Sequence, residues 1–223
     1  MALLNIRLVP DPVLFRKARK VAKITEQHKK MASDMVETMD EHHGVGLAAN
    51  QVGVLERICV IRTPEMEEAL VLVNPEIVKR EGEREVEEGC LSVPGYRGMV
   101  IRSEVVQARA LDLSSKRLKV NAENDILAQA LEHEIDHLNG IMYMDHLVAH
   151  TKLYPVKEAG EDDEFGAEHE RDDEQEHPHE HEQGQHHPEP GQLNPDFESL
   201  HRRLHDMNLD ERGAGEGERP AAP

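Results

Sequence analysis

The stretch Glu132-His133-Glu134-Ile135-Asp136-His137-Leu138-Asn139-Gly140 lies near the middle of a chain of 223 residues and contains the pattern H-E-x-x-H. On a helix, His133 and His137 are one turn apart and project from the same face, so two imidazoles can bind one metal ion. Glu134 lies beside the first His, where it can act as the general base of a metal-assisted hydrolysis. A solvated helix face that carries two His by chance is the alternative, and the rest of the chain must decide between them.

The segment around this pattern has the properties of a central helix. Between 121 and 139 apolar residues recur at helical spacing, and Gly140 stands where a helix would end. These apolar residues are Ile126, Leu127, Ala130, Leu131, Ile135 and Leu138. They occupy more than one side, so we expect the helix to be buried among other elements.

The sequence on either side predicts mainly strands. Runs of apolar and β-branched residues predict strands at 57–62, 70–73 and 84–88, with Asn74-Pro75 ending the second. The long stretch 99–113 is expected to pair with 118–120 as an antiparallel hairpin. Another amphipathic helix is predicted from Thr25 to about Gly44.

The acidic residues are unevenly distributed along the chain. The net charge is −19 overall; residues 151–223 hold 21 acidic and 7 basic residues, which leaves a net charge of only −5 in the first 150. We therefore expect one globular domain at 1–153, followed by an acidic, His-rich and disordered tail at 154–223. The acidity argues against a nucleic-acid-binding or anionic-membrane surface, and no apolar run is long enough to span a bilayer. The first residues do not have the pattern of a signal peptide, so a cytoplasmic location is expected.

A catalytic metal ion requires a third protein ligand besides the two His. Tyr143 stands where one large class of zinc proteases has a third His, which excludes that class. The remaining soft donor is Cys90, because Cys59 falls within a predicted core strand. A thiolate with two imidazoles suits Fe(II), Co(II), Ni(II) or Zn(II), and the sequence does not choose among them.

Three motifs together resemble the peptide deformylase family. Residues 44–51 match G-x-G-L-A-A-x-Q, residues 88–92 match E-G-C-L-S, and residues 133–140 match H-E-x-D-H-L-x-G. Three motifs in the right order are far more specific than the helix pattern alone. The resemblance covers roughly residues 1–150.

The resemblance implies a fold and an activity. The expected fold class is α+β, with antiparallel β-sheets surrounding a central metal-binding helix. The expected activity is hydrolytic removal of the formyl group from the N-terminal N-formylmethionine of nascent polypeptides. One divalent metal ion is implied, Fe(II) first, with Ni, Co or Zn as replacements. Transient contact with the ribosome is a further expectation.

The resemblance also assigns roles to particular residues. Cys90, His133 and His137 are the implied metal ligands, and Glu134 is the implied general base. Gln51 and the backbone N–H of Leu91 are the implied donors to the oxyanion. The residues expected to contact the substrate are Val45, Gly46, Gly89, Gly95, Arg97, Ile126 and Ala130. Glu132 departs from the family pattern, which commonly has Gln there, and we expect little effect because it points away from the ligands.

Two other functions remain as alternatives. A general metallo-peptidase would use the same helix but would cleave internal peptide bonds. A metal-binding or acidic scaffold protein would act through its tail, whose eight His residues could also bind transition metals.

Overall fold

The computed structural model describes residues 2–148 and 153–156. Its helices are α1 (Glu26–Glu41) and α2 (Ile126–Asn139), with short 3-10 turns at η1 (Pro12–Phe15), η2 (Ala49–Val52) and η3 (Tyr143–His146). Its strands are β1 (Gly46–Ala48), β2 (Ile58–Ile61), β3 (Leu70–Glu81), β4 (Arg84–Cys90), β5 (Val93–Arg102), β6 (Val105–Leu111), β7 (Arg117–Glu123) and β8 (Tyr154–Pro155).

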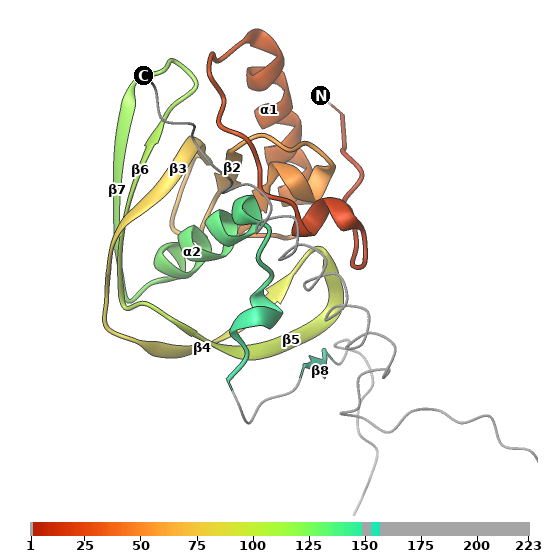
Figure 1. Ribbon diagram of the computed structural model, residues 1–223, viewed down its shortest axis with the longest axis vertical. Helices are drawn as coiled ribbons and strands as arrows, with labels where there is room; N and C mark the ends of the chain where they lie inside the picture. The colour runs from red at the N-terminus through yellow and green to blue at the C-terminus, as the bar shows by residue number, and fades with distance from the viewer. Residues whose placement is uncertain (1, 149–152, 157–223) are drawn as a thin grey trace, which may run out of the picture.

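The strands form two antiparallel sheets around α2. One sheet has the order β1-β2-β3-β6-β7 and the other has the order β4-β5-β8. Figure 1 shows α2 in the middle of the molecule, with β6 and β7 on one side, β4 and β5 below and α1 above. The expected α+β fold with antiparallel sheets around a central helix is confirmed. None of the described helices is long and apolar enough to cross a membrane.

Apolar packing places α2 against the larger sheet. Leu131, Ile135 and Leu138 of the helix share a core cluster with inward-facing residues of β2, β3 and β6, including Leu72 and Val106. The neighbouring cluster contains Met35 and Met39 of α1, which pack with residues of β1, β2 and β3. The strands between the helices are therefore buried on both faces, which explains their nearly continuous apolar sequence.

Helix α2 begins later than expected, at Ile126 instead of near 121. Residues 121–123 extend β7, which pairs with β6 as far as the partners Val105 and Glu123. Asp125 caps the helix, because its Oδ1 accepts a hydrogen bond of 2.7 Å from the backbone N–H of Ala128. At the other end, Gly140 has φ 75°, and a Cβ there would lie 2.4 Å from the carbonyl oxygen of Phe15. Only glycine fits this close approach.

Two strand predictions were wrong in extent. Strand β3 continues through Asn74-Pro75 to Glu81, because an irregularity between Val73 and Glu76 accommodates the proline. Asn74 adopts φ 54°, and its side-chain amide exchanges two hydrogen bonds of 2.8 Å with the backbone of Val21. The stretch expected as one strand at 99–113 is divided between β5 and β6.

The start of the predicted tail is partly described. Tyr154–Pro155 form β8, which pairs with Tyr96 and Arg97 of β5. The Tyr154 hydroxyl donates a 2.6 Å hydrogen bond to Glu87, so this short strand is held by a side chain as well as by the sheet. The remainder of the predicted disordered tail, from 157 onward, lies outside the described residues.

Arg57 ties the end of α2 to the larger sheet. Its guanidinium donates to the carbonyl of Leu138 at 3.1 Å, to Oδ1 of Asn139 at 2.8 Å and to the carbonyl of Pro75 at 3.0 Å. The side chain is buried, and this burial lowers the pKa of the guanidinium. The arginine therefore supplies donors to two buried carbonyl oxygens and to the partly buried side chain of Asn139.

We expect Arg57→Met to destabilise the protein by about 3 kcal/mol or more, because several buried acceptors lose their charged donor. Urea unfolding of the metal-free protein measures this change. Arg117→Met, on exposed β7, is the control and should change the free energy of unfolding by less than about 0.5 kcal/mol. Equal effects of the two substitutions would show that Arg57 has no special role.

Candidate metal centre

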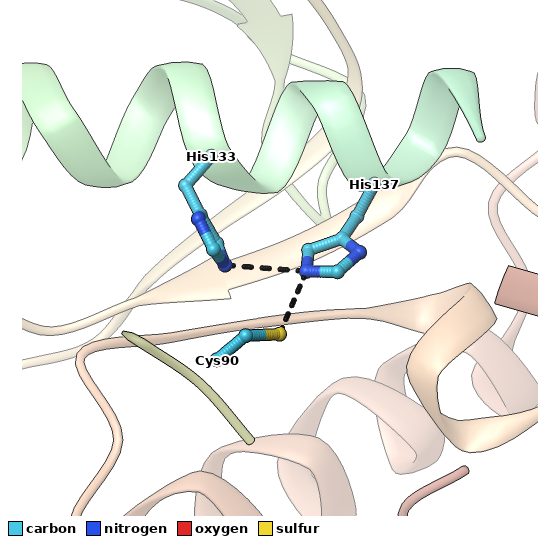
Figure 2. Close-up of side chains that lie close together, drawn as sticks. All are labelled: Cys90, His133 and His137. Carbon is cyan, nitrogen blue, oxygen red and sulfur yellow. Dashed lines mark hydrogen bonds between the residues drawn. The ribbon is translucent and has the colours of Figure 1, made fainter. Parts of the chain in front are cut away.

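Three potential ligands converge between α2 and the end of β4. His133 and His137 project from one face of the helix toward Cys90, as Figure 2 shows. The Cys90 Sγ atom lies 3.2 Å from Nε2 of His137, which in turn lies 3.2 Å from Nε2 of His133. The three ligand atoms all lie within 4.8 Å of one another. The expected Cys/His/His set is therefore brought together in space.

These separations fit one bound ion. Nitrogen and sulfur ligands at their usual distances from a tetrahedral ion are roughly 3.3 to 3.6 Å apart, and the observed spacings are close to this range. Each of the three residues offers a soft or borderline donor of the kind that binds first-row transition metals. The residues present therefore fit a single divalent ion.

The local backbone of β4 places Cys90. The pairing of β4 with β5 is irregular here: Gly89 pairs with Arg97, and Cys90, the last residue of β4, pairs with Val93. Sγ also accepts the backbone N–H of Ser92 at 3.4 Å. Burial by itself raises the pKa of the thiol, but His137 and His133 outweigh it and lower the pKa to about 5. The site thus favours the thiolate, which is the form that binds metal.

A buried chain of charged groups orients the first His. Nδ1 of His133 lies 2.9 Å from Oε2 of Glu88, which leaves Nε2 facing the ligand cluster. Arg102 holds Glu88 through two hydrogen bonds of 2.7 and 3.0 Å, and it donates another of 2.6 Å to Asp136. Burial opposes the charge on Glu88, yet His133 and Arg102 keep the pKa of this carboxyl well below its usual range.

Sequence reasoning did not assign these roles to Glu88, Arg102 and Asp136. A signal was present, because Glu88 opens the E-G-C-L-S motif and Asp136 lies within H-E-x-D-H. Metal-binding His residues regularly donate their second ring N–H to a carboxylate, so an acidic residue in a ligand motif is a candidate for that partner. Only the fold shows that Glu88, rather than Asp136, contacts His133.

Glu134 lies in a water-poor environment beside the ligands. It is 3% exposed, and its Oε2 has no hydrogen-bond partner among the described residues. Burial raises the pKa of its carboxyl to about 7; His133 and His137 act in the opposite direction. A carboxyl with a pKa near neutrality can both accept and donate a proton, which is what a general acid–base group needs.

Gly46 of β1 makes room for this carboxylate. A Cβ at Gly46 would lie 2.2 Å from Oε1 of Glu134 and 2.7 Å from its carboxyl carbon. No L side chain avoids such a contact without moving Glu134. The glycine was expected to contact substrate; the structure adds contact with the candidate base.

Gln51 is held in a fixed orientation near Cys90. Its Oε1 accepts the backbone N–H of Ala48 at 2.8 Å, which directs Nε2 toward the ligand cluster. Nε2 lies 3.4 Å from Sγ of Cys90 and 3.2 Å from Oγ of Ser92. Leu91 follows Cys90 in the turn between β4 and β5. An amide donor thus points at the centre, as an oxyanion donor must.

The other residues expected to contact substrate lie on β4, on β5, on α2 and just before β1. Gly89 and Arg97 are paired partners on β4 and β5, and Arg97 forms a 2.5 Å ion pair with Glu87. Gly95 lies two residues before Arg97 on β5, with φ 78°. The remaining three lie before β1 and on the first half of α2: Val45 is half-buried, Ala130 buried and Ile126 38% exposed.

The fold and the site together define a metal-dependent hydrolase. Comparisons with known proteins identify the family. The model of the polypeptide deformylase family matches residues 3–153. The peptide deformylase of Dehalococcoides mccartyi strain CBDB1 is 49% identical over 168 residues, which are 75% of this chain and 98% of the relative. That of Halothermothrix orenii is 49% identical over 148 residues, which are 66% of this chain and 96% of the relative.

Solved structures agree with the sequence comparisons. The crystal structure of a Legionella pneumophila peptide deformylase superposes with a TM-score of 0.64 at 44% identity, covering 66% of this chain and 88% of that one. The Thermotoga maritima enzyme gives a TM-score of 0.64 at 34% identity, with coverages of 66% and 99%. The chain belongs to the peptide deformylase family, metal-dependent enzymes that remove the formyl group from the N-formylmethionine of nascent polypeptides.

We expect Gly46→Ala to lower kcat for formate release by about a hundredfold, because the added methyl displaces the Glu134 carboxylate. The metal content should remain unchanged, since the three atoms nearest to the added methyl all belong to Glu134 and none to the ligand cluster. Steady-state kinetics and elemental analysis of the same preparation measure both quantities. Retention of full kcat would show that Glu134 tolerates the displacement.

Proposed function

We propose that Cys90, His133 and His137 bind one divalent ion and that Glu134 moves the protons of formamide hydrolysis in this chain. The observation that carries the proposal is the buried Glu134, which lies beside the three-ligand cluster and whose Oε2 has no hydrogen-bond partner within residues 2–148 and 153–156. A bound ion would activate water and polarise the formyl carbonyl. The overall reaction adds water across the C–N bond and releases formate and a free amine.

The protein groups around the cluster can carry out the remaining tasks. The Glu134 carboxylate takes a proton from the attacking water and later delivers it to the departing amine nitrogen. The Gln51 amide and the backbone N–H of Leu91 donate to the oxygen that becomes negatively charged. The Gln51 amide is oriented before the substrate arrives, because Ala48 and Ser92 fix its position.

Two free strand edges support a mode of peptide binding. Strand β1 lies at one edge of its described sheet and β4 at one edge of the other; Gly46 of β1 lies against Glu134, and β4 ends at Cys90. An extended substrate can add to such edges through its backbone, with Val45, Gly46 and Gly89 on either side. Gly95 and Arg97 of β5 would extend this surface beyond β4.

The methionine side chain of the substrate requires an apolar pocket. Ala130 is one turn before His133 on α2, and Ile126 is one turn before that. Ile126 is among the few large apolar side chains left exposed in the described part of the chain. We propose that these two residues, with Val45, contact the methionine side chain.

The ion is proposed to be Fe(II). The donor set also accepts Ni(II), Co(II) or Zn(II), so the choice rests on the family resemblance rather than on geometry. Formate release by anaerobically prepared iron protein, together with metal analysis of protein as isolated, tests the identity. Activity restricted to another of these metals would contradict it.

The remaining proposals concern where the enzyme acts. Its substrates are nascent polypeptides, so we propose a cytoplasmic location with transient ribosome contact. Cosedimentation with ribosomes, with and without residues 157–223, tests that contact and the contribution of the acidic tail. We also propose that residues 1–153 are the catalytic domain.

We expect Glu134→Ala to lower formate release from formyl-Met-Ala by about 10³-fold while the metal remains bound, because the substitution removes the proton carrier but no ligand. Formate is measured enzymatically, and bound metal by elemental analysis. Glu123→Ala, at an exposed position of β7, is the control and should leave both unchanged. Unchanged formate release by Glu134→Ala would contradict the proposed role.

The same assay separates the alternatives. A general metallo-peptidase would cleave an internal bond of unformylated peptides without releasing formate. A scaffold acting through its tail would not release formate at all.

We expect Cys90→Ser to weaken metal binding at least about tenfold, because a serine hydroxyl does not ionise near neutral pH as this thiol does. Titration of metal-free protein with Zn(II) against a competing chelator measures the affinity. Cys59→Ala is the matched control, because Cys59 is buried in β2 and outside the cluster. Equal affinity of Cys90→Ser and the parent would exclude Cys90 as a ligand.

A further inference from the structure

Each metal-binding His on α2 directly follows a buried carboxylate. Glu132 precedes His133 and Asp136 precedes His137, so the acids repeat one turn apart just as the His residues do. Neighbouring positions on a helix differ by about 100°, which turns the two carboxylates away from the metal face. Both reach the end of β5: Asp136 contacts Arg102, and Glu132 contacts the following residue, Ser103.

Both carboxylate oxygens of Glu132 accept hydrogen bonds on the side of α2 that is turned away from the metal ligands. Glu132 is 5% exposed, and its Oε2 accepts the backbone N–H of Ser103 at 2.7 Å. Its Oε1 accepts the Ser103 hydroxyl at 3.2 Å and Nε of Arg80 at 2.7 Å. Arg80 belongs to β3 and Ser103 lies between β5 and β6, so one carboxylate ties the helix to strands of both sheets.

The two partners of Glu132 are not equivalent. The Arg80 side chain is 51% exposed and borders an open cavity of about 720 Å³, which Ser103 and Glu132 also line. Water in this cavity screens the charge of the arginine. Ser103 is only 8% exposed at the wall of this cavity, so its backbone N–H is poorly hydrated and loses its acceptor if Glu132 is removed. The hydrogen bonds from Ser103 therefore contribute more to the placement of Glu132 than the ion pair does.

We propose that Glu132 is a positioning residue. Through its hydrogen bonds with Ser103 it fixes the rotation of α2 about its own axis, so that His133 and His137 point toward Cys90. This inference rests on the deformylase activity and adds a residue outside the motif roles described above. The reacting groups project from the adjacent positions His133 and Glu134, so any rotation of this turn displaces a ligand and the base together. Displacements of about 1 Å can reduce catalysis a hundredfold. Glu132 points away from the ligands, as expected from the sequence, and the proposal gives it a larger role than the small effect predicted there.

Four variants test the proposal. Glu132→Met keeps much of the volume but removes both acceptors from Ser103. Glu132→Gln keeps an amide oxygen for the Ser103 N–H, and its amide N–H can donate to the Ser103 hydroxyl. Arg80→Met removes only the ion pair, and Lys79→Met is its matched control on β3, where Lys79 pairs with Glu81 at the surface.

We expect Glu132→Met to weaken Zn(II) binding to the metal-free protein, and to lower kcat, by about tenfold or more, with KM for formyl-Met-Ala changed less than kcat. Glu132→Gln, Arg80→Met and Lys79→Met should stay within about threefold of the parent in both. Urea unfolding of each metal-free variant identifies any that fails to fold. If Glu132→Met does not fold, Glu132→Gln and Arg80→Met still test whether hydrogen bonds or charge are required.

Two results would overturn the proposal. Parent-like affinity and kcat in Glu132→Met would show that the Ser103 contacts are dispensable. A loss in Glu132→Gln or Arg80→Met as large as that in Glu132→Met would show that charge, rather than hydrogen bonding, matters. The Zn(II) titration needs no turnover, so it tests the positioning role even if the parent released no formate.

Discussion

The buried contacts of Arg102 are the interaction on which the metal centre depends. Its guanidinium binds Glu88 of β4 and Asp136 of α2, and all three side chains are nearly inaccessible to water. The same two elements carry the proposed ligands: Cys90 ends β4, and the two His lie on α2. Breaking one such buried pair leaves an uncompensated charge, which is strongly unfavourable. The ion pairs therefore hold strand and helix at the separation that a single ion requires.

The centre shifts the pKa values of two acidic groups in opposite directions: that of Cys90 is lowered and that of Glu134 is raised. The imidazoles outweigh burial at Cys90 and favour its thiolate, whereas burial dominates at Glu134 and brings its pKa to about 7. The difference follows from the contacts, because Cys90 faces the imidazoles directly and one oxygen of Glu134 has no partner. Groups whose surroundings drive their pKa values apart can take different roles, here the proposed ones of a ligand and a proton carrier.

Much of the site could be predicted from the sequence because its ligands lie in short motifs. Helical spacing alone put His133 and His137 on one face. Tyr143 stands where a third His would be expected, so Cys90 remained as the candidate for the third ligand. The supporting contacts could not be predicted in this way. The contacts of Glu88 with His133, and of Glu132 with Ser103, join segments that are 45 and 29 residues apart in the chain. Such pairs follow from strand register, which local patterns do not encode.

The sequence by itself determined the family, the central helix and the chemical types of the ligands, since all three depend on local spacing and residue chemistry. It did not determine where α2 starts, how long β3 is or why position 46 requires a glycine. Pairing of β7 with β6 delays the helix, an irregularity lets β3 pass a proline, and the Glu134 carboxylate occupies the space of a Cβ at Gly46. Each of these outcomes was decided by tertiary structure, because each depends on which atoms of a distant segment arrive at the same place.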